Sequence, residues 1–117
     1  MRTKEQVLLD IEKSGMVAVV RGETSEKAME IVEKCIEGGI QAVELTFTVP
    51  FAHRVIEDLA RKYGDQIILG AGTVLDSETA RIAILSGAEF VVSPHFNSEI
   101  VKLCNRYRKA VMQGILN

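Results

Sequence analysis

The sequence predicts an α/β fold built on a parallel sheet, because two kinds of segment alternate along it. Short apolar runs, with little of the polar alternation of half-exposed strands, begin roughly every 20 to 26 residues. Amphipathic segments of helical length separate them. This order is typical either of an open doubly wound sheet or of part of a (β/α)8 barrel.

Five runs are expected to form strands. Three of them share a pattern in which glycine precedes an apolar run that ends at a polar or turn residue. The other two are apolar without the leading glycine. The expected strands lie within 14–22, 38–46, 66–70, 86–94 and 110–112.

The helices have recognisable start and stop signals. Asp76 and Asn97 can cap helix N-termini, and Pro50 suits the first turn of a helix. Another helical pattern begins after Thr24-Ser25. The glycine pair 38–39 and Gly87 are stop signals. The expected helices cover about 4–13 and the segments that follow Thr24, Pro50, Asp76 and Asn97.

Length and composition exclude several classes. At 117 residues the chain is at most one domain, and its 47% apolar and 26% charged residues are ordinary for a soluble protein. A net charge of −2 without a basic cluster argues against nucleic-acid binding. No apolar run is long enough to span a membrane, and the charged N-terminus is unlike a signal peptide, so we expect a cytoplasmic protein.

Cysteine and histidine give no sign of a metal site. Cys35 and Cys104 lie on separate helical patterns, so buried free thiols in a reducing compartment are expected. Two histidines without a carboxylate at ligand spacing do not make a tight metal site. His53 is expected to be solvated on a helix.

Glu44 is the most informative residue. It lies in an apolar run that is otherwise typical of a buried strand. An ionised carboxylate buried there without partners costs several kcal/mol, so its presence indicates either a function or an ion pair with a neighbouring Arg or Lys.

Polar groups follow four of the expected strands, where the C-terminal ends of a parallel sheet meet. Together they supply a cation, a carboxylate, hydroxyls and an imidazole, a set that suits a small anionic substrate with proton transfer by Glu44. The alternatives are that Arg21 simply pairs with Glu44, that 70–73 is only a tight turn, and that His95 is a surface group. The four groups are Arg21; Glu44 with Thr46 and Thr48; 70–73; and 93–95.

Five of these segments together resemble bacterial 2-keto-3-deoxy-6-phosphogluconate aldolase, also called 4-hydroxy-2-oxoglutarate aldolase. The resemblance runs through essentially the whole chain in order, in the segments 19–21, 38–39, 43–50, 70–74 and 86–95. It implies a (β/α)8 barrel, usually trimeric, that cleaves its substrate to pyruvate and an aldehyde. The reaction proceeds through a lysine Schiff base, without metal or other cofactor.

The resemblance also implies site residues. Glu44 matches the general acid/base, Thr73 a residue that contacts the pyruvate-derived part of the substrate, and Pro94 a residue that lines the pocket. Thr48 stands where some members have an arginine. Arg21 then takes the anion-binding role.

Two departures from the family bear on activity. The fifth strand of the family usually ends in Pro-Gly, whereas this chain has Gln113 before the glycine. The Schiff-base lysine belongs to the sixth strand and the phosphate site to the last two, so residues 1–117 are expected to form a partial barrel that lacks strands six to eight. The seven lysines present fall on helical segments or, for Lys109, at the opposite end from the site.

Three readings follow. The chain is the N-terminal part of an aldolase; or a non-catalytic, self-associating α/β remnant whose strand edges and apolar face drive association; or a related pyruvate- or sugar-phosphate-binding barrel completed by another chain.

Overall fold

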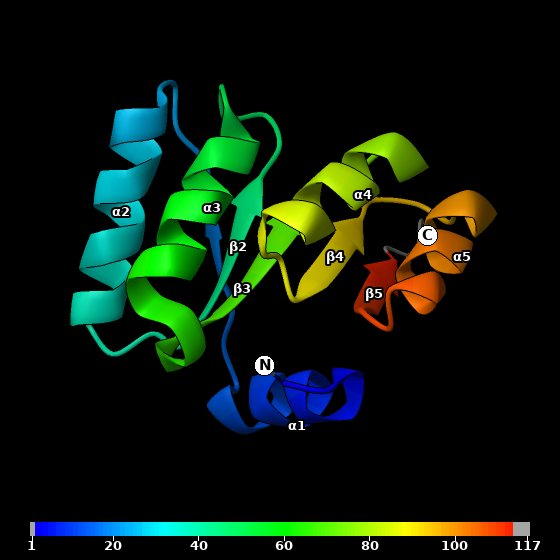
Figure 1. The fold of residues 1–117 in the computed structure, drawn as a ribbon. Coiled ribbons are helices and arrows are strands. Elements are labelled where there is room, and N and C mark those ends of the chain that lie inside the picture. The colour runs from blue at the N-terminus through cyan, green and yellow to red at the C-terminus, as the bar shows by residue number, and fades with distance from the viewer. Residues whose placement is uncertain (1, 114–117) are drawn as a thin grey trace.

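The computed structural model describes residues 2–113 and contains a five-stranded parallel sheet in the order β1-β2-β3-β4-β5 (Figure 1). Each strand pairs with the next one in the chain, which confirms the predicted parallel α/β fold. The strands are β1 (Ala18–Val20), β2 (Ala42–Thr46), β3 (Ile68–Gly72), β4 (Phe90–Ser93) and β5 (Ala110–Gln113). The helices are α1 (Lys4–Ser14), α2 (Ser25–Glu37), α3 (Ala52–Tyr63), the 3₁₀ turn η1 (Gly64–Gln66), α4 (Ser77–Ser86) and α5 (Ser98–Arg106).

The strand order decides between the two architectures left open by the sequence. A doubly wound sheet reverses its strand order and carries helices on both faces, because each crossover is right-handed. Here the order never reverses, and α2 to α5 lie on the same side of the sheet (Figure 1). This is the winding of a barrel, in which the face without crossover helices is the inner one.

The helix boundaries follow local capping chemistry. Asp76 and Asn97 cap α4 and α5 as predicted. Thr24 caps α2, and Thr3 caps α1 by accepting a hydrogen bond from the Gln6 amide. Pro50 differs from the prediction, because it precedes the N-cap of α3 and does not lie in its first turn.

The reason for this difference is a tight turn after β2. The Val49 amide donates to the Thr46 carbonyl at 3.1 Å, and the Ala52 amide donates to the Val49 carbonyl at 3.2 Å. Phe51, the N-cap, has a left-handed backbone (φ 57°). Pro50 therefore belongs to the turn, and helical geometry begins only after Phe51.

The two faces of the sheet bury different side chains. The outer face packs against α2 to α5 through a large core that includes Leu45 and Val91. The inner face holds a smaller cluster in which Val7 of α1 packs over Ala42, Ile68, Phe90 and Ala110. Helix α1 thus covers the N-terminal end of the inner face, and the C-terminal end is left for a site.

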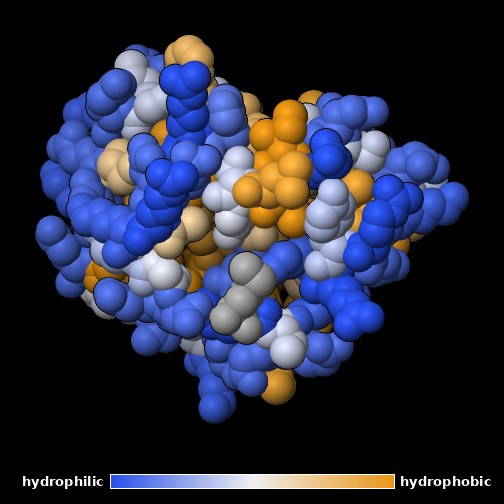
Figure 2. All heavy atoms as spheres, viewed as in Figure 1, coloured by the Kyte–Doolittle hydropathy of each residue, from blue (hydrophilic) through white to orange (hydrophobic). Residues whose placement is uncertain are grey.

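Some apolar side chains remain on the surface. On the inner face, Val19 is 53% exposed. On the outer surface, Ile82 and Leu85 of α4 are 47% and 61% exposed. Figure 2 shows an apolar area at the centre of the face in view. No helix within residues 2–113 has the length and apolar character needed to cross a membrane.

The cysteines partly follow the prediction. Both thiols are free, and Cys104 is buried, but Cys35 is partly exposed. Burial raises the pKa of the Cys104 thiol to about 11. Cys35 is only partly buried because α2 lies at the side of the sheet formed by its first strand, where no further helix packs over it in the described chain.

Candidate active site

The predicted site residues gather at the C-terminal end of the sheet. Glu44 lies on the inner face of β2, between Val19 of β1 and Gly70 of β3. Arg21 directly follows β1, Thr73 follows β3, and Pro94 follows β4. Thr48 lies two residues beyond the end of β2. We call this end of the sheet the rim. These residues share it, as their positions after the apolar runs predicted, and their roles remain predictions.

The Glu44 side chain crosses from its own strand over the neighbouring strand β3. A Cβ atom added to Gly72 would lie only 2.0 Å from Oε2 of Glu44. Burial raises the pKa of the half-buried Glu44 carboxyl, and the nearby positive charge of Arg21 lowers it less strongly. A carboxyl that is held partly desolvated in this way is suited to exchange protons with a ligand.

Arg21 does not form an ion pair with Glu44 in the described part of the chain. Its side chain is exposed and acts on Glu44 through charge, and the ion pairs of residues 2–113 do not include this pair. The ion pair between Arg21 and Glu44, one alternative raised by the sequence, is therefore not formed among the described residues. The guanidinium is free to meet an anion at the rim.

Two hydroxyls meet beyond the end of β2. Thr46 is fully buried, and its Oγ1 lies 2.6 Å from Oγ1 of the exposed Thr48. The turn that begins at Thr46 holds this pair in place. Because the hydroxyl of Thr48 is exposed, it can also bond to a ligand.

Thr73 has a strained backbone. Its φ of 54° lies in the left-handed region, which a β-branched residue rarely adopts. Neighbouring strands hold both sides of the turn: the Phe47 amide donates to the Gly72 carbonyl at 2.9 Å, and the Val74 amide to the Val92 carbonyl at 3.2 Å. Such strain amounts to about 1–3 kcal/mol and is concentrated at functional sites. Residues 70–72 belong to β3, so the turn expected over 70–73 begins only at Thr73, whose role remains a prediction.

The segment after β4 is fixed by a buried hydroxyl. Ser93 is fully buried and donates to the carbonyl of His95 at 3.0 Å, while Pro94 and His95 are exposed. His95 is therefore a surface group in this structure, the alternative given for it above. His53 is exposed on α3, as expected.

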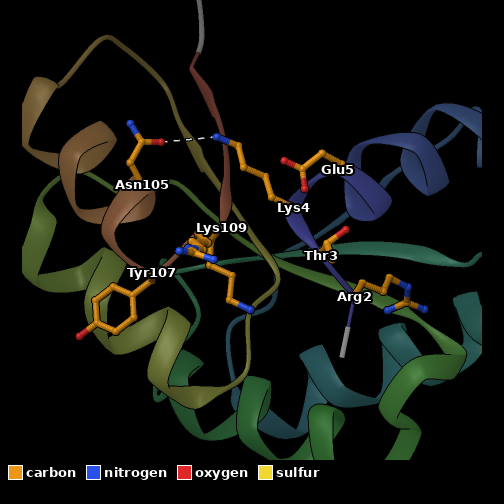
Figure 3. Close-up of a pocket in the computed structure, with 8 residues that line it drawn as sticks. Arg2, Thr3, Lys4, Glu5, Asn105, Tyr107 and Lys109 are labelled. Carbon is orange, nitrogen blue, oxygen red and sulfur yellow. Dashed lines mark hydrogen bonds between the residues drawn. The ribbon is translucent and has the colours of Figure 1, made fainter.

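At the opposite end of the sheet lies a hollow of about 510 Å³ next to the start of α1 (Figure 3). Its walls include the cations Arg2, Lys4 and Lys109, and Lys4 donates to Asn105 at 3.4 Å. Lys109 directly precedes β5, at the end away from the rim, as the sequence predicted.

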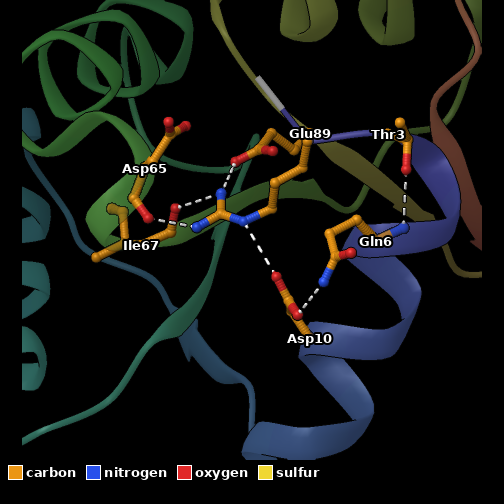
Figure 4. Close-up of polar contacts among 7 residues, drawn as sticks. Thr3, Gln6, Asp10, Asp65, Ile67 and Glu89 are labelled. Atoms are coloured by element: carbon orange, nitrogen blue, oxygen red, sulfur yellow. Dashed lines mark hydrogen bonds and ion pairs between the residues drawn. The ribbon is translucent and has the colours of Figure 1, made fainter.

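Next to this hollow, Arg2 makes the polar network of Figure 4, which sequence reasoning missed. The guanidinium donates to Glu89 at 2.6 Å and to the Ile67 carbonyl at 3.1 Å, contacts the Asp65 carbonyl, and pairs with Asp10 at 3.3 Å. The available signal was Glu89, a carboxylate directly before an apolar run. The carboxylates of Asp10 and Glu89 balance the positive charge of Arg2. Because its partners lie on α1 and directly before β3 and β4, the network connects α1 to the starts of these two strands.

The described residues contain no group of three or more His, Cys, Asp or Glu side chains that could hold a metal ion.

Comparison with known proteins identifies the family of this chain. Residues 8–117 match the family described as "Aldolase: KDPG and KHG aldolase". The chain is 37% identical over 105 residues to 2-dehydro-3-deoxy-phosphogluconate aldolase of Treponema pallidum, covering 90% of this chain and 50% of that protein. It is 31% identical over 102 residues to 2-dehydro-3-deoxy-6-phosphogalactonate aldolase of Escherichia coli, covering 87% and 50%.

Solved structures give the same result. KDPG aldolase from Legionella pneumophila, described with pyruvate captured as a covalent carbinolamine intermediate, superposes with a TM-score of 0.78 at 26% identity, covering 86% of this chain and 48% of that one. The chain spans about half the length of the relatives it matches. Its five parallel strands and the helices between them correspond to part of the TIM barrel of these aldolases. On this evidence the chain belongs to the KDPG and KHG aldolase family.

Proposed function

We propose that the rim binds a small 2-keto acid such as pyruvate and that Glu44 moves protons at its carbonyl, as part of class I aldolase chemistry. The observation that carries this proposal is the Glu44 side chain itself. It is half-buried, its pKa is raised by burial, and it reaches across β3 towards the strained turn at Thr73.

The remaining rim residues have complementary roles in this proposal. Arg21 supplies a cation for the substrate's carboxylate, and the exposed hydroxyl of Thr48 bonds to its oxygens. Thr73 contacts the keto-acid part, and Pro94 lines the pocket wall. These groups come from four adjacent strand ends, which supports the proposal that they share one binding position.

Carbon–carbon bond cleavage in this chemistry needs an amine that forms an imine with the keto acid. All seven lysines lie within residues 2–113, and each lies on a helix or, for Lys109, directly before β5. None lies on the inner face of the sheet near Glu44. We therefore propose that residues 1–117 form a partial barrel that binds the keto acid without an imine of its own, and that the barrel's remaining strands supply the lysine.

The test is a pair of measurements with pyruvate. The expected result is a pyruvate-dependent rise in melting temperature that disappears in Glu44→Gln and Arg21→Ala and persists in Arg61→Ala, an exposed arginine on α3 paired with Glu57. Borohydride reduction followed by intact-mass measurement should show no adduct on the 12.9 kDa chain. If both rim variants keep the rise, the rim is not the keto-acid site; an adduct on this chain contradicts the placement of its lysines.

A second candidate function is self-association without catalysis. It is favoured by Val19, which is 53% exposed on the inner face, and by Ile82 and Leu85 on α4, which are 47% and 61% exposed. Exposed apolar surface of this kind drives association. A discrete oligomer in sedimentation velocity that is indifferent to pyruvate favours this candidate over the first.

A further inference from the structure

Strand β3 carries two glycines on its inner face, and a side chain from a neighbouring strand covers each of them. At Gly70 an added Cβ would lie 2.2 Å from the ring of Phe90, which comes from β4. At Gly72 it would lie 2.0 Å from Oε2, 2.6 Å from Cδ and 2.8 Å from Cγ of Glu44, which comes from β2. Real Cβ atoms do not approach other atoms this closely. Phe90 and Glu44 can therefore hold these positions only because residues 70 and 72 have no side chain.

The Phe90 ring and the Glu44 carboxylate differ in their freedom to move. Phe90 is fully buried in the inner cluster under α1, so its ring has no space to retreat. Glu44 is only half-buried, and the residue beside it on β1, Val19, is 53% exposed. The Glu44 carboxylate, at the end of a flexible side chain, can therefore swing away from β3.

We propose that Gly72 is a positioning residue for Glu44: its missing side chain lets the carboxylate lie across β3, close to the turn at Thr73. This inference rests on the proposed function, in which Glu44 and Thr73 act on the same keto acid. It adds that Gly72, which offers the ligand no side chain, determines where the Glu44 carboxylate lies relative to Thr73.

A methyl group at position 72 has a definite consequence. In Gly72→Ala the carboxylate cannot occupy its position over β3 and moves towards β1, where the inner face is open and Arg21 contributes its positive charge. Both changes favour the ionised carboxylate. The fold itself should persist, because the outer core does not include Gly72.

The experiment follows the titration of Glu44 by ¹³C NMR of glutamate carboxyl groups, with the signal assigned by its loss in Glu44→Gln. We expect the Glu44 midpoint to move to lower pH in Gly72→Ala, with a small change in melting temperature. Gly70→Ala is the matched control on the same strand and face. It should lower the melting temperature strongly, because it displaces the packed Phe90 ring. An unchanged Glu44 midpoint in a folded Gly72→Ala protein overturns the proposal.

If Gly72→Ala does not fold, a second variant decides the question. Glu44→Ala removes the group that occupies the space above Gly72, so the double variant Gly72→Ala/Glu44→Ala should fold with the melting temperature of Glu44→Ala. A double variant that stays unfolded shows that another group is the obstacle, and the proposal fails.

The two proposals fail separately. A Glu44 midpoint that shifts in Gly72→Ala while the native protein ignores pyruvate supports the positioning role and contradicts the proposed function. Pyruvate binding that Gly72→Ala leaves unchanged, together with an unshifted midpoint, contradicts only the positioning role.

Discussion

Replacing Arg2 with alanine should destabilise the protein more than the loss of a surface ion pair. Its side chain is 15% exposed and pairs at 2.6 Å with Glu89, whose side chain is 10% exposed. Arg2→Ala removes that partner and the hydrogen bonds to the carbonyls of Asp65 and Ile67. The other carboxylate oxygen of Glu89 is buried without a partner among the described residues, so the variant would leave a buried charge with little compensation.

The magnitude follows from this burial. Removing one partner of a buried pair costs about 3–5 kcal/mol, and the charge of Lys109, which also acts on Glu89, favours the lower end. About 3 kcal/mol is a large part of the roughly 5–15 kcal/mol that stabilises a domain. At roughly 4 °C per kcal/mol, the melting temperature should fall by about 12 °C.

The penalty should depend on pH in a defined direction. Burial raises the pKa of Glu89 above its ordinary value of 4.5, and Arg2 lowers it, so the pKa rises further in Arg2→Ala. For a carboxyl with a raised folded-state pKa, stability is greatest below the unfolded-state pKa and is lost as pH rises through the folded-state pKa. The variant should therefore be weakest near pH 7–8 and approach the native protein as pH falls towards 4.5.

Urea unfolding from pH 5 to 8 measures this effect. The control Arg2→Ala/Glu89→Gln replaces the carboxyl with a neutral amide and should lose the extra pH dependence. Lys62→Ala, which removes an exposed ion pair with Glu33, should leave the midpoint close to that of the native protein. A penalty for Arg2→Ala below about 1 kcal/mol, or one that is constant across this pH range, refutes the account of the Arg2 network.

Three further predictions follow from local features. Thr73→Gly should raise the free energy of unfolding by up to about 1 kcal/mol in urea melts, because glycine adopts the left-handed backbone without strain. It should also weaken keto-acid binding, because the side chain proposed to contact the keto acid is lost. A loss of stability contradicts the strain argument. Asp76→Ala should cost about 1 kcal/mol through loss of the bond that the Thr79 amide donates to it at 2.6 Å. Hydrogen bonds with the Thr79 side chain and amide lower the pKa of Asp76, so the native contribution should disappear on acidification below the folded-state pKa, as melts of both proteins would show. Alkylation followed by mass spectrometry should modify Cys35 first and Cys104 only on unfolding, because Cys104 is buried with a pKa of about 11; equal rates would contradict its burial.

Much of the fold was predictable because its signals are local. Capping residues such as Asp76 and Asn97 act within three residues of themselves, so the helix starts could be read without tertiary information. The same holds for the apolar runs of the strands, since burial on both faces requires continuous apolar sequence. The prediction that Pro50 lies in the first turn of α3 was wrong, because hydrogen bonds donated by the Val49 and Ala52 amides form a turn that determines where α3 begins.

The sequence by itself determined the order of strands and helices, the family, and the presence of a carboxylate in a buried strand at Glu44. Only the tertiary structure decided what Glu44 contacts, since its position over Gly72 depends on the register between β2 and β3. The contact of Arg2 with Glu89 likewise joins residues 87 positions apart. Local preferences act over a few residues, whereas register and long-range ion pairs exist only once the strands have paired.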